Sequence, residues 1–208
     1  MLTLYRMKWS TNCERVEMAL AYKGLTAESA WVKDEDRSMV RMVSGQDLVP
    51  VLVHDGQVVI DSMEIVRHLE QHFPDTPPLY PEEPARRADC LLFIDWFNRV
   101  WKRPPNEMEA ELNKPEDRRD MARVDRLGKA MAGYLDLLEA MLTGREHLLG
   151  EFSAADIAAF PFVKYATIPP EPGDIYLFHR ILTEHQKPGT THPRVCDWIA
   201  RMDRRPRA

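Results

Sequence analysis

Two hydroxyl side chains stand directly before the first helical pattern of the chain. Ser10 and Thr11 precede residues 13–24, in which apolar residues recur at spacings of three and four before Gly24 ends the pattern. A hydroxyl donor at a helix N-terminus, with the helix dipole behind it, stabilises an anion held there. Stabilisation of a bound anion is therefore the first candidate chemistry, and a plain helix N-cap is the alternative interpretation of Ser10.

A second group of polar positions lies in residues 48–73. Two short apolar runs flank the Asp-Gly pair at 55–56, which favours a tight β-hairpin. Pro50 heads the first run, and Asp61 and Ser62 follow the second run and open a helical pattern. The X-Pro bond and the polar helix start therefore lie close together, where they can present main-chain groups and a helix N-terminus to a small anionic peptide.

The elements that must position these residues alternate between strand and helix. For residues 1–76 the sequence predicts the order β-α-β-α-β-β-α, with strands at 2–7 and 26–33, a helix at 13–24 and a short helix or loop at 34–45 before the hairpin and its helix. Strands separated by helices imply parallel pairing, and the hairpin adds an antiparallel edge. We expect an α/β domain.

A proline-rich stretch at 74–84 ends this pattern and marks the best domain boundary. We place the first domain at 1–76, a linker at 77–84 and an all-helical domain at 85–208. Helices are predicted there at 85–101, 116–142, 153–166, 174–186 and 193–204. The prolines at 104, 105 and 115 bracket a segment that we expect to be an irregular connection.

Composition argues against several kinds of partner and site. The chain has 208 residues and a formal net charge of −5, which disfavours a broad nucleic-acid surface. The three cysteines are far apart, without a CxxC pair, so neither a disulfide framework nor a zinc site is expected. His68 and His72 share a helix face but lack a third ligand nearby in the sequence, and we expect no metal. The N-terminus lacks a signal-peptide pattern and no apolar run reaches membrane length, so we expect a cytoplasmic protein without a membrane partner.

These residues resemble the glutathione transferase family over nearly the whole chain. Its motifs appear here as Ser10-Thr-Asn-Cys-Glu-Arg-Val, Val49-Pro50-Val-Leu, Asp61-Ser62 and Phe152-Ser-Ala-Ala-Asp156. The resemblance is nearest to the serine- and cysteine-type classes, among them tau, omega and zeta-like proteins. It implies a thioredoxin-like N-terminal domain (βαβαββα), an all-helical C-terminal domain in which Asp156 belongs to a buried capping motif, a cytoplasmic transferase and a two-fold homodimer.

The resemblance also implies a donor for the glutathione thiol. In the family the serine or cysteine position falls five residues before the arginine that matches Arg15, which selects Ser10. Zeta-like members use the neighbouring hydroxyl position, which would select Thr11. Cys13 lies about one turn inside the helix. We expect it to be a buried helix residue, and direct thiol chemistry is the alternative.

The other implied contacts to glutathione lie in the second group of polar positions. A cis Pro50 would let Val49 offer its N–H and C=O to the cysteinyl part. Ser62 would hold the γ-glutamyl carboxylate with its main-chain N–H, and Asp61 would contact the γ-glutamyl amine or simply cap its helix. Asp47 departs from the family, because a basic or amide residue often meets the glycyl carboxylate near this position. We expect compensation from Lys33, Arg37 or Gln46.

The implied second substrate is a small hydrophobic electrophile bound between the two domains. We predict contacts from Trp9, Trp96 and Arg103. Conjugation and related thiol reactions share the glutathione half of the site, so the sequence does not separate them. Two alternatives remain: a non-catalytic binding or regulatory protein on the same scaffold, which Asp47 favours, and an enzyme that uses another low-molecular-weight thiol.

Overall fold

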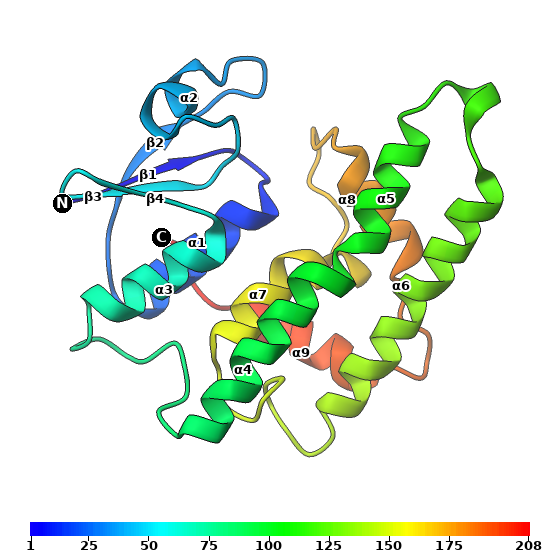
Figure 1. Ribbon diagram of the computed structural model, residues 1–208. Helices are drawn as coiled ribbons and strands as arrows, with labels where there is room; N and C mark the ends of the chain where they lie inside the picture. Colours follow the sequence, from blue (N-terminus) through cyan, green and yellow to red (C-terminus); the bar gives the residue numbers. More distant parts are fainter. The chain divides into compact units, whose positions relative to one another are not determined.

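The computed structural model describes residues 1–208 in two units (Figure 1). One unit contains Met1–Glu82 together with Arg205–Ala208, and the other contains Glu83–Arg204. The last four residues thus belong to the same unit as the first strand. Each unit is described by itself below.

The first unit has the predicted order of elements. It comprises β1 (Leu2–Arg6), α1 (Thr11–Tyr22), β2 (Glu28–Trp31), α2 (Ser38–Ser44), β3 (Val51–His54), β4 (Gln57–Ile60) and α3 (Ser62–His72). The sheet has the order β2-β1-β3-β4, in which β1 and β2 are parallel and the other two pairs are antiparallel. The predicted thioredoxin-like α/β arrangement is confirmed.

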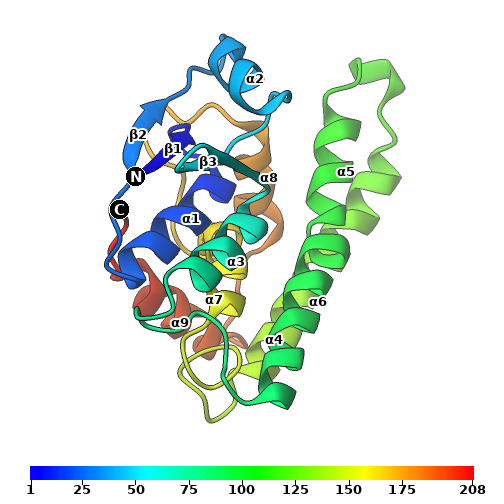
Figure 2. The same cartoon turned by 60° about the vertical axis from the view of Figure 1, so that its left-hand side comes forward.

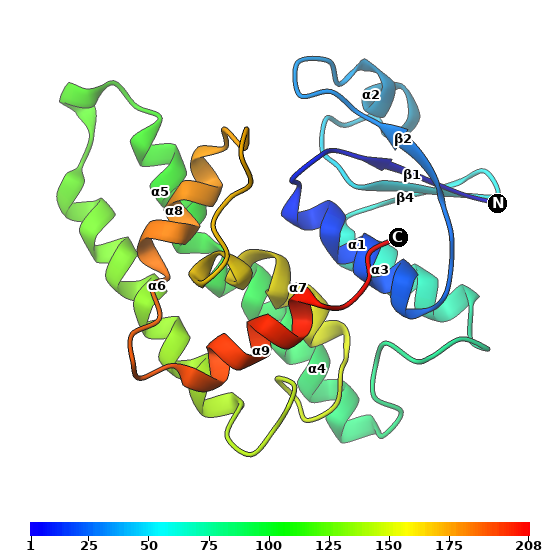
Figure 3. The ribbon, with the colours of Figure 1, turned by 180° about the vertical axis from the view of Figure 1, so that it is seen from behind.

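Two helices lie side by side on one face of this sheet, and α2 lies on the other side (Figures 1 and 3). α1 and α3 bury their apolar faces against the strands, and Leu4, Val16, Leu52 and Ile65 are each at most 1% exposed. The hairpin between β3 and β4 turns at Asp55 and Gly56, which have φ angles of 49° and 87°. Two positive φ angles in a two-residue turn match the twist of the flanking strands.

The second unit is helical throughout. It comprises α4 (Pro84–Trp96), a π-helical turn (Phe97–Trp101), α5 (Arg103–Leu112), a 3-10 turn (Glu116–Arg118), α6 (Met121–Met141), α7 (Ala154–Val163), a 3-10 turn (Lys164–Ala166), α8 (Leu177–His185) and α9 (Pro193–Asp203). α5 and α6 lie side by side (Figure 2). No helix is long and apolar enough to cross a membrane.

Two predictions for this unit were wrong. The segment expected to be an irregular connection forms α5, because Pro104 and Pro105 fall in its first turn, where no N–H is needed. The long helix predicted at 116–142 begins only at Met121. Asp120 accepts a hydrogen bond from the main-chain N–H of Arg123 at 2.9 Å and so caps α6 at that point.

The predicted capping motif of α7 is present. Ser153 is the N-cap, and its hydroxyl accepts a hydrogen bond from Ala155 N at 3.3 Å. Asp156 is 0% exposed and accepts from Ser153 N at 3.1 Å, Leu148 N at 3.1 Å and Trp198 Nε1 at 2.8 Å. One buried carboxylate thereby joins the start of α7 to the preceding loop and to α9.

Candidate functional site

The sheet register brings three predicted segments to one end of the first unit. Tyr5 on β1 lies opposite Val51 on β3, and Val51 lies opposite Ile60 on β4. The chain leaves β1 at the same sheet end where it enters β3 and leaves β4. Residues 7–10, 49–50 and 61–62 are therefore neighbours at this end.

Ser10 is the N-cap of α1, and its hydroxyl oxygen accepts a hydrogen bond from Cys13 N at 3.3 Å. The interpretation as a helix cap thus holds. A hydroxyl also has a hydrogen to donate, so the cap does not exclude a second role. Ser10 is half-buried, whereas Thr11 is only 7% exposed. Trp9, directly before the cap, has a φ of 62°, an uncommon value for a bulky residue.

The peptide bond between Val49 and Pro50 is cis, as predicted. Val49 precedes β3 and is half-buried, while Pro50 is buried. The N–H and C=O of Val49 make no hydrogen bond within the protein. The pair of main-chain groups that the sequence predicted for a peptide ligand is therefore present.

Asp61 and Ser62 form the start of α3. One oxygen of Asp61, Oδ1, accepts hydrogen bonds from Met63 N at 2.8 Å and Glu64 N at 3.2 Å, so Asp61 caps the helix. Its φ is 69°. Ser62 is 3% exposed, and its N–H lies in the first turn, where the helix offers no acceptor. The cap leaves this N–H at the positive end of the helix dipole.

Arg15 connects the two helix starts, and sequence analysis did not include it in the site. The guanidinium is 1% exposed and donates to Asn12 Oδ1 at 3.3 Å and to Ser62 Oγ at 3.2 Å. Burial lowers the pKa of the Arg15 guanidinium to about 9, and the negative charge of Asp61 opposes this decrease. Arg15 therefore stays positive at neutral pH. The sequence did offer one signal for Arg15. It is a charged residue one turn before Ala19 on an otherwise apolar helix face, and a buried charge needs polar partners.

Asp47 is paired with a residue that the sequence did not suggest. Arg41, at the end of α2, holds Asp47 Oδ1 with Nη2 at 2.7 Å and Nε at 2.8 Å. Of the three residues expected to compensate, Arg37 pairs with Asp34, and Gln46 donates to the Leu48 carbonyl at 3.1 Å. The negative charge of Asp47 is balanced, although by a different residue.

One of the two candidates in the helical unit, Trp96, packs against a tyrosine that was missed. The Trp96 ring packs edge-on against Tyr134, with ring centroids 5.6 Å apart. Tyr134 lies on α6. Arg103 on α5 pairs with Glu107, whose Oε1 lies 2.6 Å from Arg103 Nε. Trp9 belongs to the first unit, where Lys8 Nζ lies 4.1 Å from its ring centroid.

The predicted burial of Cys13 is confirmed, since this residue is 1% exposed. Burial raises the pKa of its thiol to about 11, and the hydrogen bond with Ser10 opposes this rise only partly. The thiolate, which is the reactive form, is therefore disfavoured. Direct thiol chemistry at Cys13 has no support in this geometry.

His68, one of the two histidines on the same face of α3, is buried against the sheet. This residue is 6% exposed, and its Nε2 lies 2.9 Å from His54 Nδ1 on β3. The pKa of His68 is lowered by burial and then by the two neighbouring imidazoles. No group of three His, Cys, Asp or Glu residues has a geometry that could hold a metal ion.

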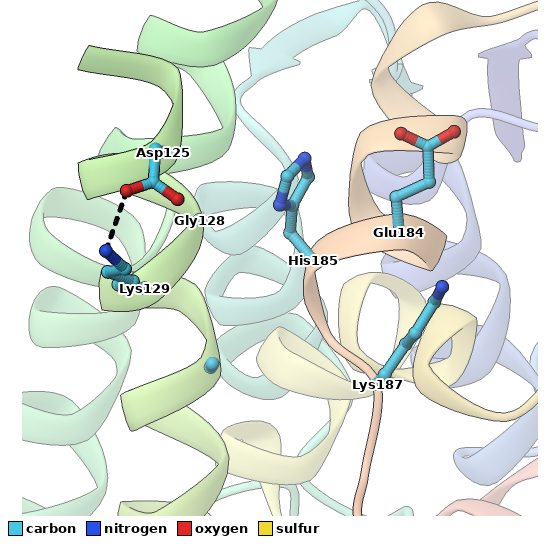
Figure 4. A pocket seen from close by; sticks show the side chains of 7 residues that line it. Asp125, Gly128, Lys129, Glu184, His185 and Lys187 are labelled. Atoms are coloured by element: carbon cyan, nitrogen blue, oxygen red, sulfur yellow. Dashed lines mark ion pairs between the residues drawn. The ribbon is translucent and has the colours of Figure 1, made fainter. Parts of the chain in front are cut away.

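A hollow of about 280 Å³ lies in the helical unit between α6 and the end of α8 (Figure 4). Charged side chains of both signs line it, and Lys129 pairs with Asp125 at 2.7 Å across one turn of α6. None of the predicted site residues lines this hollow.

Comparison with known proteins gives the same family as the motifs. The family model described as "Glutathione S-transferase, N-terminal domain" matches residues 4–78. Glutathione S-transferase U10 of Arabidopsis thaliana is 31% identical over 91 residues, 43% of this chain, and the match spans only 39% of that relative. Glutathione S-transferase GstB of Escherichia coli (strain K12) is 30% identical over 172 residues, which cover 78% of this chain and 82% of GstB.

A solved structure extends the similarity to the whole chain. Rice GST1 (OsGSTU1), in complex with glutathione, superimposes with a TM-score of 0.75 and 25% identity, covering 98% of this chain and 86% of the rice chain. The likeness therefore includes the helical unit, which the family model does not reach. The chain belongs to the glutathione S-transferase family.

Proposed function

We propose that this protein binds glutathione at the sheet end described above, stabilises its thiolate and directs it at a small hydrophobic electrophile. The observation that carries the proposal is the convergence of three groups at that end: the Ser10 hydroxyl, the unpaired main chain of Val49 and the N–H of Ser62. Each group suits a different part of an anionic peptide. Relatives named glutathione S-transferases, and a structural neighbour solved with glutathione, support this ligand.

Ser10 is the proposed donor to the thiolate. Its oxygen already accepts from Cys13 N, so its own hydrogen can point outward to a sulfur atom. The same N-terminus supplies the positive end of the α1 dipole, and both effects favour the anion over the thiol. Thr11 is the alternative donor, but its burial at 7% exposure makes Ser10 the better placed hydroxyl.

The remaining proposed contacts hold the peptide. Val49 would pair with the cysteinyl residue through its N–H and C=O next to the cis Pro50. The N–H of Ser62 would bind the γ-glutamyl carboxylate at the α3 dipole. Asp61 uses Oδ1 for capping, which leaves Oδ2 for the γ-glutamyl amine.

The pairing of Arg41 with Asp47 bears on the identity of the thiol. An isolated Asp47 would repel the glycyl carboxylate and would favour another thiol or a non-catalytic protein. With Arg41 at 2.7 Å this repulsion is offset, which favours glutathione among the three alternatives.

In the proposed reaction the thiol loses its proton to solvent and the thiolate stays hydrogen-bonded to Ser10. The sulfur then forms a bond to an electrophilic carbon, and that carbon either expels a leaving group or passes its electron pair to a group that takes up a proton. Trp96, which packs against Tyr134, and Arg103 are proposed to contact the electrophile from the helical unit, and Trp9 is proposed for the same role in the first unit. We further propose that the protein is a homodimer, as is implied for its family.

Immobilised glutathione tests the ligand. We expect the protein to be retained and to elute competitively with free glutathione, because its anchoring groups are main-chain atoms that folding alone positions. The Ser10→Ala variant should still be retained, since it keeps those groups. Absence of retention at millimolar glutathione would contradict the proposal.

Ultraviolet absorbance of the bound thiolate tests the donor. Ser10→Ala should lose this absorbance at neutral pH and should lower kcat/KM by about 10²- to 10³-fold, the usual cost of one donor to a developing anion. Thr11→Ala is the matched control and should keep the thiolate. If Thr11→Ala loses it and Ser10→Ala does not, the assignment of the two hydroxyls is reversed.

A further inference from the structure

Three histidines gather where the last turns of α3 lie against the end of β3 (Figure 2). His54 is the last residue of β3, and its Nδ1 lies 2.9 Å from Nε2 of His68 on α3. His72, one turn further along α3, stacks on His68 with ring centroids 3.8 Å apart, and its Nδ1 lies 2.9 Å from the His68 carbonyl oxygen. The Phe73 ring stacks on His54. The three imidazoles of His54, His68 and His72 are called the histidine clasp below.

The acceptors around the histidine clasp indicate where its hydrogens lie at neutral pH. A carbonyl oxygen only accepts, so His72 Nδ1 carries a hydrogen and donates it to the His68 carbonyl. Asp55 Oδ2 lies 3.5 Å from His54 Nε2, and a carboxylate favours a hydrogen on that nitrogen. Neutral His54 then has its lone pair on Nδ1, which accepts from the Nε2–H of His68. One hydrogen bond between neutral rings thus joins β3 to α3.

The two ends of the histidine clasp can take up protons. His72 can gain a proton on Nε2 without losing its hydrogen bond, and the C-terminal turn of a helix favours a positive charge. His54 and His68 can share one further proton, because the ring without it then accepts across the 2.9 Å contact. That proton belongs on His54, which lies beside the Asp55 carboxylate, since His68 is only 6% exposed.

A proton on His68 in addition is the one that the closed histidine clasp cannot hold. With His54 already charged, it sets two N–H groups against each other across 2.9 Å, with no acceptor between them. It also brings together three positive rings whose centroids are 3.8, 5.2 and 5.5 Å apart. The pKa of His68 is lowered by burial first, and then by the charges of His72 and His54.

No opposite charge acts on His68 to offset this cost. Strands β3 and β4 carry no charged residue besides the histidine itself. On α3, Glu64 pairs with Arg67, and the amino group of Met1 binds Asp55. α1 and its C-cap carry four charged side chains, which contact Arg207, Ser62, Arg6 and Glu70 in that order: Glu14, Arg15, Glu17 and Lys23.

We propose that the histidine clasp is an acid-sensitive fastening of α3 to the sheet, which opens when His68 takes up a proton. Near neutral pH the clasp is closed and holds the last turns of α3 on β3. As the pH falls below about 6.5, the ordinary pKa of a histidine, the open state binds the proton that the closed state rejects, so opening becomes more favourable. The clasp acts within the fold of the first unit and is independent of the ligand that the unit binds.

Hydrogen exchange of the α3 main chain tests the proposal in the full-length protein. Protection of residues 65–73 is measured from about pH 7.5 to about pH 5 and corrected for the intrinsic dependence of exchange on pH. We expect protection to fall by up to about tenfold for each pH unit below about 6, the slope for one proton taken up on opening. Protection of α7 in the helical unit is the internal reference and should stay constant.

His68→Gln is the decisive variant. A glutamine amide has both a donor and an acceptor, so it can keep a hydrogen bond to neutral or charged His54, and it does not titrate. Protection of α3 in His68→Gln should therefore stay nearly constant over the same pH range. His185→Gln is the matched control, because His185 is a half-buried histidine outside the clasp, and this variant should keep the slope of the unmodified protein.

Nuclear magnetic resonance of the imidazole ring hydrogens in the unmodified protein gives a second test that needs no variant. Of the three rings in the histidine clasp, His68 should titrate last as the pH falls. Its titration should coincide with the loss of protection in α3, because both report the same opening.

Three results would overturn the proposal. One is constant protection of α3 down to the lowest pH in the unmodified protein. Another is an equal fall in His68→Gln, which would place the acid sensitivity outside the clasp. The third is uptake of a proton by His68 while α3 stays protected, since the closed clasp would then accept the charge. Retention on immobilised glutathione is unaffected by any of these results, so the proposed function stands or falls separately.

Discussion

Trp9 and Asp61 have left-handed main-chain conformations, with φ angles of 62° and 69°, and they flank the two helix starts of the proposed site. Such conformations are uncommon outside glycine and concentrate where a protein must hold an unusual geometry. Here each of them turns the chain directly before a helix, Trp9 before α1 and Asp61 before α3. The Ser10 hydroxyl and the Ser62 N–H therefore both lie at a helix N-terminus. No pattern in the sequence signals a left-handed tryptophan, because aromatic residues are not favoured there.

Cys13 should make the protein lose stability in alkali. Its folded pKa is about 11 against 9.0 for an unperturbed thiol, because burial penalises the thiolate. The folded chain then holds the proton more tightly than the unfolded chain, so this contribution to stability is complete below about pH 9 and is lost as the pH rises through 11. About 2 kcal/mol should disappear from the free energy of unfolding over this window.

Urea unfolding between pH 8 and pH 11 measures this loss. Cys13→Ala should flatten the dependence of the unfolding free energy on pH relative to the unmodified protein. Cys196→Ala is the control. Burial also raises the pKa of the Cys196 thiol, but Cys196 is only half-buried, so its removal should flatten the slope less than Cys13→Ala does. Identical slopes in all three proteins would show that the Cys13 thiol titrates freely.

Helices were predicted correctly where the residues at their start form a recognisable cap, and wrongly where they do not. The α7 start was predictable because Ser153 and Asp156 form a capping box at the spacing that sequence alone displays. α5 was missed because two prolines read as a break, although in a first turn they are harmless. The start of α6 was placed too early because the polar residues before Met121 fit the helical period, and only the Asp120 cap separates them from the helix.

Asp156 should contribute more to stability than any exposed helix cap. Replacing it with alanine leaves three buried donors, Ser153 N, Leu148 N and Trp198 Nε1, without their acceptor. We expect Asp156→Ala to lower the free energy of unfolding by about 3 to 5 kcal/mol. The matched control is Asp120→Ala at the exposed cap of α6, which should cost about 1 kcal/mol.

Chemical denaturation with fluorescence of the tryptophans compares the two variants. The same loss in both would mean that the buried carboxylate is no more than a helix cap. A larger loss in Asp156→Ala would show that this one side chain ties α7 to the preceding loop and to α9.

At the scale of the molecule, the apolar surface supports the proposed homodimer. In the first unit, Met42, Leu48, Val58 and Ile60 are between 42% and 84% exposed on α2, the segment before β3, and the edge strand β4. In the helical unit, Leu91 and Leu92 on α4 are 45% and 69% exposed. Clustered exposed apolar residues commonly mark an interaction surface.

Light scattering after size exclusion tests the dimer. The unmodified protein should have twice the mass of one chain, and Leu92→Glu should shift it toward the mass of a single chain, because a buried unpaired carboxylate is costly. Ile175→Glu is the control at an exposed loop residue and should leave the mass unchanged. A single-chain mass for the unmodified protein would contradict the proposal.

The sequence predicted the two-part architecture and the main-chain half of the candidate site better than it predicted the charges around that site. Hairpin chemistry and the Val-Pro and Asp-Ser pairs are local signals, so they survive without tertiary information. Four contacts brought about by the fold were not predicted, because no local sequence rule connects the two residues of each pair. They are made by Arg41, Arg15, Tyr134 and Arg207. Charge pairing across the fold is what the sequence alone left open.

The return of Arg205–Ala208 to the first unit also orders events during synthesis. Domains fold largely as they emerge from the ribosome, N-terminal parts first. The sheet, α1 and α3 can form as soon as their residues have emerged, but Arg207 reaches Glu14 only after the whole of Glu83–Arg204 has been made. A nascent chain can therefore hold the sheet, α1 and α3 in place before Arg205–Ala208 reach them, and the ion pair between Arg207 and Glu14 is among the last contacts of the first unit to form.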